Sequence, residues 1–266
     1  MLLHQTHNSI GEDIYNAYLY ANPDWLIHFH KSFELAIVTS GQVTATVDGE
    51  EYTINKGQAV LIAPYQLHSY STPESCNLFV VVFSGTYTEN FARLIQNKRL
   101  INPVVDLDEL TYRLIDEKLL CGTVLSGKSN ARAPKPHTYD IKSALYAVCS
   151  LVIKSTELVQ RTNDGKLVFE ILQYVENNFL QDITLNSLSF HLGYDYSYVS
   201  RIFSANIKVN FKTLVNQYRC DFAKNLIVST QKDFADIAYQ SGFQSIRSFN
   251  RAFKQVTGHS PSHYRK

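Results

Sequence analysis

Between residues 13 and 84 the hydrophobic positions fall in short runs, and several of these runs alternate with polar positions. Short runs rich in β-branched and aromatic residues are typical of β-strands. We expect strands at residues 13–21, 34–39, 42–47, 51–54, 59–62 and 78–84. Turn signals separate them, among them Ser40-Gly41 and Asp48-Gly49. Many short strands at this spacing predict a small barrel or jelly roll in residues 1–85.

The hydrophobic pattern changes to helical spacing after residue 85. We expect helices at residues 88–96, 106–120 and 139–159, with a turn-rich break at residues 121–137. Residues 122–138 are predicted to form a mobile loop. The accessory helices of residues 86–160 either cover the barrel or form a dimer contact, and the pattern leaves both alternatives open. Residues 161–165, Arg-Thr-Asn-Asp-Gly, are predicted to be an interdomain hinge.

Residues 236–266 have the pattern of two short helices separated by a glycine turn. Asp233 can cap the first helix, and Gly242 can end it in a left-handed conformation. Ser245 can cap the second helix, and Gly258 can end it. The apolar face of this second helix comprises Phe249, Ala252, Phe253 and Val256. The opposite, polar face is suited to a DNA major groove.

A second copy of this pattern begins about fifty residues earlier. Leu192-Gly193-Tyr194 corresponds to Ser241-Gly242-Phe243, and residues 200–203 correspond to residues 250–253. Between the copies, residues 211–228 are predicted to form one helix that Asn210 can cap. A helix of about eighteen residues spans roughly 27 Å, which is comparable to the ~34 Å between successive major-groove faces. Residues 166–266 are therefore predicted to be an all-α DNA-binding domain with two helix-turn-helix units.

Each copy leaves a set of side chains on the face opposite its apolar residues. In the first copy these candidate DNA-binding residues are Tyr196, Ser197, Ser200, Arg201 and Ser204. In the second copy they are Ile246, Arg247, Asn250, Arg251 and Lys254. Arginine and asparagine can form paired hydrogen bonds with base edges, whereas serines specify a base weakly.

The C-terminal signature resembles that of the AraC/XylS family of bacterial transcription regulators. The matching segments are Ile237-Ala238, Gly242-Phe243, Phe249 to Lys254 with Arg251 between, Gly258-x-Ser260-Pro261 and Tyr264-Arg265. The resemblance implies a cupin-like effector domain joined to a double helix-turn-helix domain, and an α+β chain of two domains. It also implies promoter DNA, a small-molecule effector and RNA polymerase as partners, a homodimer, and a role as activator.

Two features of the chain depart from the usual pattern of that family. The family commonly has a glycine at the position of Lys208, so the turn there is uncertain. The first recognition helix usually supplies much of the base discrimination. Here Arg201 is its single charged candidate, so we expect the second helix to contribute unusually strongly.

The distribution of charge agrees with this interpretation. Residues 165–266 hold 12 Lys+Arg and 7 Asp+Glu, a net charge of +5, whereas the rest of the chain holds 13 against 17, a net charge of −4. The basic part is the one predicted to contact phosphates.

A group of potential ligands lies in the strand-rich region. The run from His28 to Glu34, with His30 between, resembles the first cupin motif, and Gly57, Pro64 and His68 resemble the second at a shortened spacing. In metal-bearing cupins the positions of His28, His30, Glu34 and His68 hold the ion, and such ligands suit a divalent transition metal.

We nevertheless expect an effector pocket without cofactor or bound metal, because family members often use the barrel interior for a small effector. The candidate effector-binding residues are His28, His30, Glu34, His68, Tyr18 and Tyr20. The tyrosines favour a sugar-like or aromatic ligand. The rival hypothesis is a metal-dependent cupin enzyme with an appended DNA-binding domain. A third is a constitutive DNA-binding protein with an inert barrel.

The four cysteines, Cys76, Cys121, Cys149 and Cys220, are scattered without a paired spacing. We expect reduced, buried thiols rather than disulfides or a zinc knuckle. We identify neither a membrane-spanning run nor a secretion signal, so a cytoplasmic location is expected.

Overall fold

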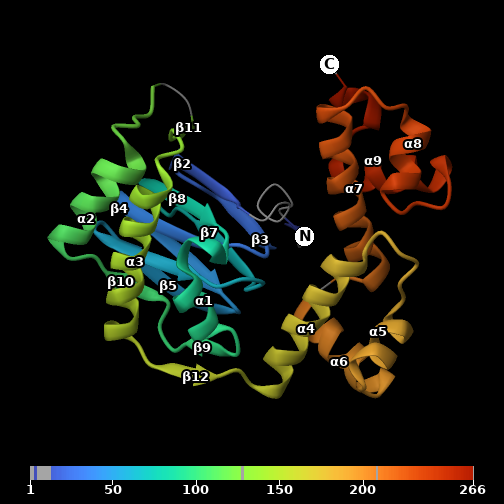
Figure 1. The fold of residues 1–266 in the computed structure, drawn as a ribbon, viewed down its shortest axis with the longest axis horizontal. Helices are drawn as coiled ribbons and strands as arrows, with labels where there is room; N and C mark the ends of the chain where they lie inside the picture. The colour runs from blue at the N-terminus through green and yellow to red at the C-terminus, as the bar shows by residue number, and fades with distance from the viewer. Residues whose placement is uncertain (1–2, 5–12, 127–128, 208, 266) are drawn as a thin grey trace. The chain divides into compact units, whose positions relative to one another are not determined.

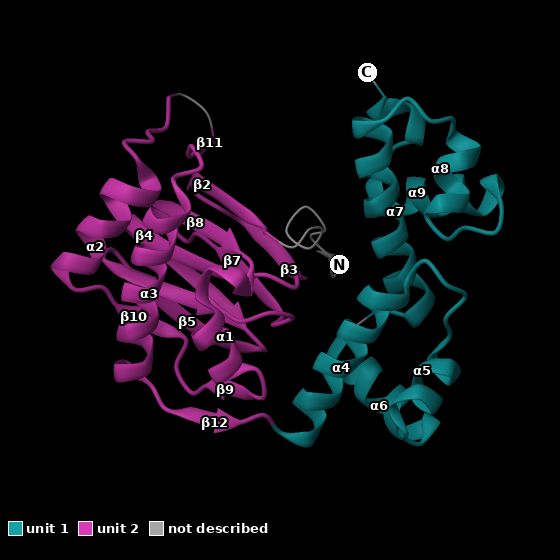
Figure 2. Ribbon diagram, in the orientation of Figure 1, with its two compact units in different colours: residues 1–7, 162–266 teal, residues 8–161 magenta. Residues whose placement is uncertain are grey.

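The computed structural model describes residues 3–4, 13–126, 129–207 and 209–265 of the 266. The chain divides into two compact units (Figure 2), one of residues 8–161 and the other of residues 162–266 together with residues 1–7. Thr162 caps helix α4 (Asn163–Asn178) by accepting a hydrogen bond from the backbone N–H of Gly165. The segment predicted to be a hinge is therefore helical from Asn163 onward.

A curled antiparallel sheet forms the centre of residues 8–161 (Figure 1). Its main path runs β3-β7-β4-β8-β2-β11, while β5 pairs with β4, and β6 pairs with both β4 and β10. The bounds are β2 (Tyr15–Ala21), β3 (Trp25–Phe29), β4 (Phe33–Val47), β5 (Glu50–Asn55), β6 (Gln58–Ile62), β7 (His68–Ser71), β8 (Cys76–Phe83), β10 (Val104–Asp106) and β11 (Asn130–Arg132); β1 is Leu3–His4. The predicted barrel is thus an open half-barrel, and the α+β fold class is confirmed.

Successive side chains along each strand point to opposite faces of this sheet. On β4, Phe33, Leu35 and Ile37 belong to a cluster that also contains the buried residues of the covering helices. Ala36 and Val38 belong to a second cluster on the inner face of the curl. Glu34 is in phase with this second set, so the strand period directs its carboxylate to the inner face.

Several strands differ from the sequence prediction. β4 continues through Ser40-Gly41, where a turn was expected. Gly41 has φ +71°, the pairing of β4 with β8 shifts register between Val38 and Ser40, and a Cβ on Gly41 would overlap the carbonyl oxygen of Ser75. The glycine therefore makes a bulge that bends one long strand. β3 and β7 were not predicted.

Helices cover the outer face of the sheet. They are the 3₁₀ turn η2 (Gly85–Thr88), α1 (Glu89–Ile95), α2 (Glu109–Ile115), its π-helical continuation η3 (Asp116–Leu120), and α3 (Thr138–Ser155). The predicted helix 106–120 begins late because residues 104–106 pair with β6 and Asp108 caps α2. The predicted helix 139–159 ends early because β12 (Leu158–Gln160) pairs with β9 (Lys98–Leu100).

The loop predicted over residues 122–138 contains β11, which pairs with β2. Residues 127–128 of this loop lie outside the described residues.

The second unit contains the predicted helical repeats. Besides α4 it has α5 (Leu185–Leu192), α6 (Tyr196–Ile207), α7 (Phe211–Ser229), α8 (Phe234–Gln240), α9 (Ile246–Thr257) and the 3₁₀ turn η4 (Pro261–Tyr264). Asn210 caps α7, Asp233 caps α8 and Ser245 caps α9, each through its side chain. The expected caps are thus confirmed. Lys208, where the turn was uncertain, lies outside the described residues.

All four cysteines are free thiols. Cys76, Cys149 and Cys220 are buried as expected, but Cys121, which ends η3 with φ 52°, is exposed. None of the described helices combines the length and apolar character needed to cross a membrane.

Candidate nucleic-acid interface and effector pocket

The α8–α9 pair has a closely packed apolar side. Phe249 and Phe253 are fully buried, with ring centroids 5.4 Å apart, and Tyr264 of η4 lies 5.6 Å from Phe253. Ser245 accepts a hydrogen bond from the backbone of Ser248, which satisfies a free N–H at the start of α9. The candidate residues Ile246, Arg247, Asn250, Arg251 and Lys254 are all exposed. Burial of one side therefore presents the other to solvent.

The turn of this pair is fixed against the end of α4. Gly242 has φ +82°, and a Cβ there would lie 2.8 Å from the carbonyl oxygen of Leu180. Arg219 of α7 donates hydrogen bonds to the carbonyls of Phe179 (2.6 Å) and Gln181 (2.7 Å), and its guanidinium lies 5.7 Å from the ring centre of Phe243. The same arginine thus contacts both the segment between α4 and α5 and the α8–α9 turn.

The α5–α6 pair repeats this design with different contacts. Thr184 and Ser187 form a reciprocal capping box at the start of α5, and Gly193 ends the helix with φ +72°. On α6, Val199, Ile202 and Phe203 are buried. Of the candidate residues, Tyr196, Ser197, Arg201 and Ser204 are exposed, and Ser200 is half-buried.

Tyr198 was not recognised from the sequence, yet it lies beside the charged candidate of α6. The guanidinium of Arg201 lies 5.2 Å from the centre of the Tyr198 ring, and the Tyr198 hydroxyl donates to Asp164 over 2.8 Å. The i, i+3 spacing on a helix was the available signal. This stacking restricts Arg201 before any partner is bound.

Helix α7 joins the two pairs. Phe211 at its start packs against Phe203 of α6, and Tyr218 further along packs against Phe179 at the end of α4. Its later residues Cys220, Ala223 and Ile227 belong to the apolar cluster of α8 and α9. One continuous helix therefore contributes to both cores.

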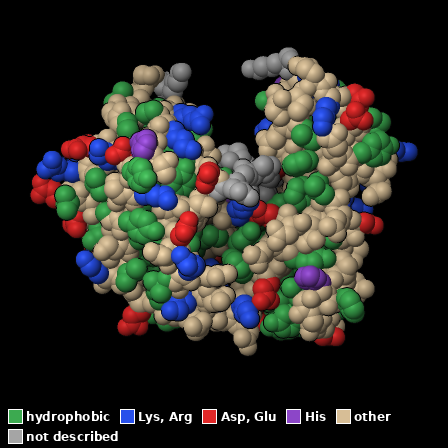
Figure 3. Space-filling model, in the orientation of Figure 1, with side chains coloured by type: hydrophobic (Ala, Val, Ile, Leu, Met, Phe, Trp, Pro, Cys, Tyr) green, Lys and Arg blue, Asp and Glu red, His purple; other side chains and the backbone are tan. Residues whose placement is uncertain are grey.

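The Lys and Arg side chains on the face shown in Figure 3 are dispersed among acidic ones.

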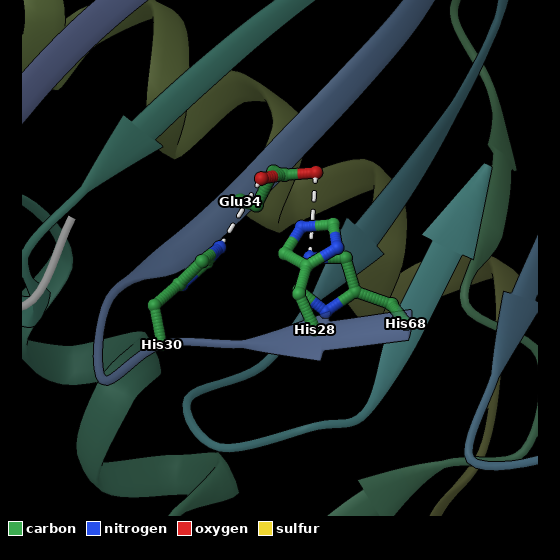
Figure 4. A group of neighbouring side chains, drawn as sticks. All are labelled: His28, His30, Glu34 and His68. Carbon is green, nitrogen blue, oxygen red and sulfur yellow. Dashed lines mark hydrogen bonds and ion pairs between the residues drawn. The ribbon is translucent and has the colours of Figure 1, made fainter. Parts of the chain in front are cut away.

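The four candidate ligands of the strand-rich unit lie together. His28 on β3 pairs directly with His68 on β7, His30 follows the end of β3, and Glu34 lies near the start of β4. All four are buried, and one potential ligand atom from each lies within 4.8 Å of the others. Figure 4 shows the three imidazoles and the carboxylate directed toward one another.

Hydrogen bonds hold each member of this cluster, which we call the His₃Glu cluster. The Nδ1 atoms of His28, His30 and His68 each lie 2.9 Å from a backbone carbonyl oxygen, those of Leu26, Ser32 and Gln66 respectively. His30 Nε2 lies 3.2 Å from Glu34 Oε2, and His68 Nε2 lies 3.7 Å from Glu34 Oε1. The Tyr70 hydroxyl donates to Glu34 Oε1 over 2.7 Å.

Burial controls the charge of this cluster. It lowers the pKa of His28 to about 3, with His68 contributing in the same direction, and it also lowers the pKa of His30. Burial alone would raise the pKa of Glu34, but the imidazoles of His68 and His30 outweigh it and hold that pKa well below its usual value. Burial and the adjacent Glu34 raise the pKa of Tyr70 well above its usual value. The low pKa values of His28 and His30 keep these two imidazoles neutral beside the Glu34 carboxylate.

Aromatic side chains adjoin the His₃Glu cluster. Trp25 packs edge-on against Tyr20 at 4.6 Å and against Tyr70 at 5.5 Å, and its centroid lies 6.3 Å from that of His28. Tyr20 is thus joined to the cluster through Trp25. Tyr18 packs against Tyr20 at 5.8 Å and lies under the guanidinium of Arg132. Sequence reasoning missed Trp25 because β3 was not predicted, although it is the single tryptophan of the chain.

Known proteins resemble both units. Residues 15–116 match the model of an AraC-like ligand binding domain, and residues 188–266 match that of a helix-turn-helix domain. The melibiose operon regulatory protein of Escherichia coli K12 is 24% identical over 259 residues, which covers 90% of this chain and 83% of the relative. An uncharacterized HTH-type transcriptional regulator of Staphylococcus aureus is 37% identical over 103 residues, 39% of this chain. That match spans 14% of the Staphylococcus protein.

A structural likeness extends over nearly the whole chain. The structure of ToxT from Vibrio cholerae superposes with a TM-score of 0.58 at 16% identity and covers 94% of this chain and 97% of ToxT. The fold and the two matched models define a protein with a ligand-binding half-barrel and a helix-turn-helix region. The chain thus combines an AraC-like ligand-binding domain with a helix-turn-helix domain, and it is homologous to AraC family regulators.

Proposed function

We propose that this protein is a sequence-specific regulator of transcription that binds double-stranded promoter DNA through α6 and α9. The observation that carries the proposal is the pair of exposed polar faces on these two helices, whose opposite faces are buried in cores that share α7. The 19 residues of α7 span about 28 Å at 1.5 Å per residue. That length is comparable to the ~34 Å between successive major-groove faces on one side of a duplex.

Selection of bound duplexes from a random DNA pool, using the full chain, tests this proposal. We expect two recurring half-sites about 10 base pairs apart, with α6 and α9 each reading one of them. Inserting about 5 base pairs between the half-sites turns one to the opposite side of the duplex and should weaken binding strongly. This mode of binding would be refuted if the selected duplexes shared no sequence. It would also be refuted if the insertion left the affinity unchanged.

We further propose that the inner face of the half-barrel binds a small-molecule effector, with a sugar as one candidate class. Tyr18, Tyr20 and Trp25 supply aromatic surfaces beside the His₃Glu cluster, as a sugar or an aromatic ligand requires. A relative is named for the melibiose operon, and ToxT has been solved with an unsaturated fatty acid, so these relatives do not favour one effector class. Trp25 emission should report binding, and a true effector must also change DNA affinity because linkage is reciprocal.

The homodimer is proposed to form through the outer face of α3. Tyr139, Tyr146 and Ile153 on this helix are 76%, 39% and 46% exposed, and they recur at seven-residue spacing. The other face of α3 is buried against the sheet, through residues such as Ile141, Leu145 and Val148. An apolar stripe of this period is what a second copy of α3 would pair with.

Because of its similarity to AraC family regulators, we propose that the protein acts as an activator that contacts RNA polymerase, in the cytoplasm, where promoter DNA is located. We also propose that it acts by binding rather than by catalysis, because the relatives reported above are named as regulators. Transcription from a promoter carrying the selected site, with and without the protein, measures activation directly. A fall in transcript on adding the protein would indicate a repressor instead.

A further inference from the structure

We propose that the His₃Glu cluster binds one divalent transition-metal ion in the half-barrel, with His28, His30, His68 and Glu34 as its ligands. The inference goes beyond the regulatory function and replaces our expectation of a metal-free pocket. It does not depend on DNA binding, because metal content can be measured without DNA. If the protein binds metal but no operator DNA, only the regulatory function fails. If it binds operator DNA but no metal, only the present proposal fails.

The first step of the argument is the position of the imidazole protons. Each histidine of the cluster places Nδ1 at 2.9 Å from a backbone carbonyl oxygen. A carbonyl oxygen accepts hydrogen bonds and cannot donate them, so each Nδ1 carries a hydrogen. In a neutral imidazole the other nitrogen, Nε2, then holds a lone pair. This is the arrangement by which backbone carbonyls orient histidine ligands of metals.

The second step is that the three Nε2 atoms converge on one another and on the Glu34 carboxylate, and that two of them have no hydrogen-bond partner. His30 Nε2 is 3.2 Å from Glu34 Oε2, and His68 Nε2 is 3.7 Å from Glu34 Oε1. Within the described part of the chain, the buried Nε2 atoms of His28 and His68 have no hydrogen-bond partner. Tyr70 supplies one O–H, which goes to the carboxylate. Four electron-pair donors facing one another in a buried site are stabilised by a cation at their centre.

The third step concerns which cation fits. Three imidazole nitrogens and one carboxylate oxygen suit zinc, iron, manganese, cobalt or nickel rather than calcium or magnesium, which prefer oxygen ligands. Two ligands of one ion with bonds of about 2.1 Å lie at most about 4.2 Å apart. The ligand atoms here lie within 4.8 Å of one another, so a pair at that limit must approach by at least about 0.6 Å when an ion binds. The Tyr70 hydroxyl would orient the ligating carboxylate.

The experiment uses the full chain without a polyhistidine tag, purified without chelator. Elemental analysis should find about one transition-metal ion per chain. After the protein is stripped with a chelator, Co²⁺ alone should restore one equivalent with the visible absorption of a nitrogen-ligated site. Co²⁺ should also quench Trp25, whose ring centroid is 6.3 Å from that of His28. At a hundredfold excess over Kd, the metal should raise the Tm of the stripped protein by about 5 °C or more.

Glu34→Gln provides the discriminating variant because it keeps the side-chain shape and supplies an N–H to His30 Nε2. Without metal this variant should melt at or above the temperature of stripped wild type, and Co²⁺ should neither colour nor stabilise it. His28→Gln should likewise bind at least about tenfold more weakly. The matched control is His259→Ala with His263→Ala, which removes two exposed histidines stacked at 4.2 Å and should leave stoichiometry unchanged.

Three results would overturn the proposal. One is wild-type protein that neither retains metal nor takes up Co²⁺, Zn²⁺, Fe²⁺, Mn²⁺ or Ni²⁺. Another is metal binding that the His259/His263 control abolishes, since the ion would then be held at the surface. The third is a stripped Glu34→Gln protein that melts well below stripped wild type, because an imidazolium–carboxylate pair between His30 and Glu34 would then hold the site without metal.

Discussion

Gly242 lies against Leu180, so closely that a Cβ on Gly242 would stand 2.8 Å from the Leu180 carbonyl oxygen and 2.9 Å from its Cα. The glycine belongs to the α8–α9 turn, whereas Leu180 lies between α4 and α5, just before the first helix-turn-helix pair. Since backbone atoms on both sides make this contact, no side chain can yield to relieve it. The contact therefore fixes the α8–α9 turn against the segment that leads into the first helix-turn-helix pair.

Gly242→Ala should destabilise the helical unit by roughly 2–4 kcal/mol, through left-handed strain together with the clash at Leu180. Gly193→Ala is the matched control: its φ is +72° but nothing lies within 4 Å of the added Cβ. It should cost about 1–2 kcal/mol, the strain alone. Denaturant unfolding of the full chain, followed by far-UV circular dichroism, measures both. Equal losses for the two variants would show that the contact with Leu180 contributes nothing.

Arg247→Ala and Arg251→Ala should each weaken binding to the selected DNA by roughly 1–3 kcal/mol and relax the preference at one base pair. Both side chains are exposed on α9, so neither truncation opens a cavity. Titrations against the selected site and its single-base variants give the affinity and the preference. Arg113→Ala, which removes an exposed arginine from the other unit, should leave both unchanged. Unaltered preference in both α9 variants would mean that this face does not read bases.

Phe253→Ala should lower the free energy of unfolding of the helical unit by roughly 3–5 kcal/mol, since a large aromatic side chain is removed from a closed core. Phe253 is fully buried and packs against Phe249 and Tyr264. Thermal melting of the full chain should show the loss in one transition while the half-barrel transition stays in place. An unchanged melting profile would contradict the assignment of Phe253 to the core.

Tyr146→Glu should shift the protein from dimer to monomer, because it places a charge in the centre of the apolar stripe on α3. Leu110→Glu on α2 is the comparison, since Leu110 is 76% exposed and belongs to the other helix considered for the dimer. Light scattering coupled to size-exclusion chromatography gives the mass of each variant. If Leu110→Glu gave a monomer and Tyr146→Glu did not, the dimer interface would have to be assigned to α2 instead of α3.

The helical unit was predicted closely because its signals are local. Asp233, Asn210 and Ser245 cap helices through bonds three residues along the chain, and Gly242 and Gly258 have the left-handed conformation that ends a helix. Such features depend on neighbouring residues, so the sequence shows them directly. The predicted ends of the accessory helices were wrong because residues 104–106 and 158–160 form strands instead. Their pairing depends on partner strands that lie far away in the sequence.

The sequence by itself determined the two repeats, the residues on the outer faces of α6 and α9, and the presence of three histidines and a glutamate at suggestive positions. Only the tertiary structure decided that these four side chains converge, because the antiparallel register of β3 and β7 places His28 opposite His68. Tertiary structure also fixed each imidazole by a bond to a backbone carbonyl, and set Gly242 against Leu180. A helix cap needs only its own turn of chain. A buried cluster needs strands whose pairing is set by the whole sheet.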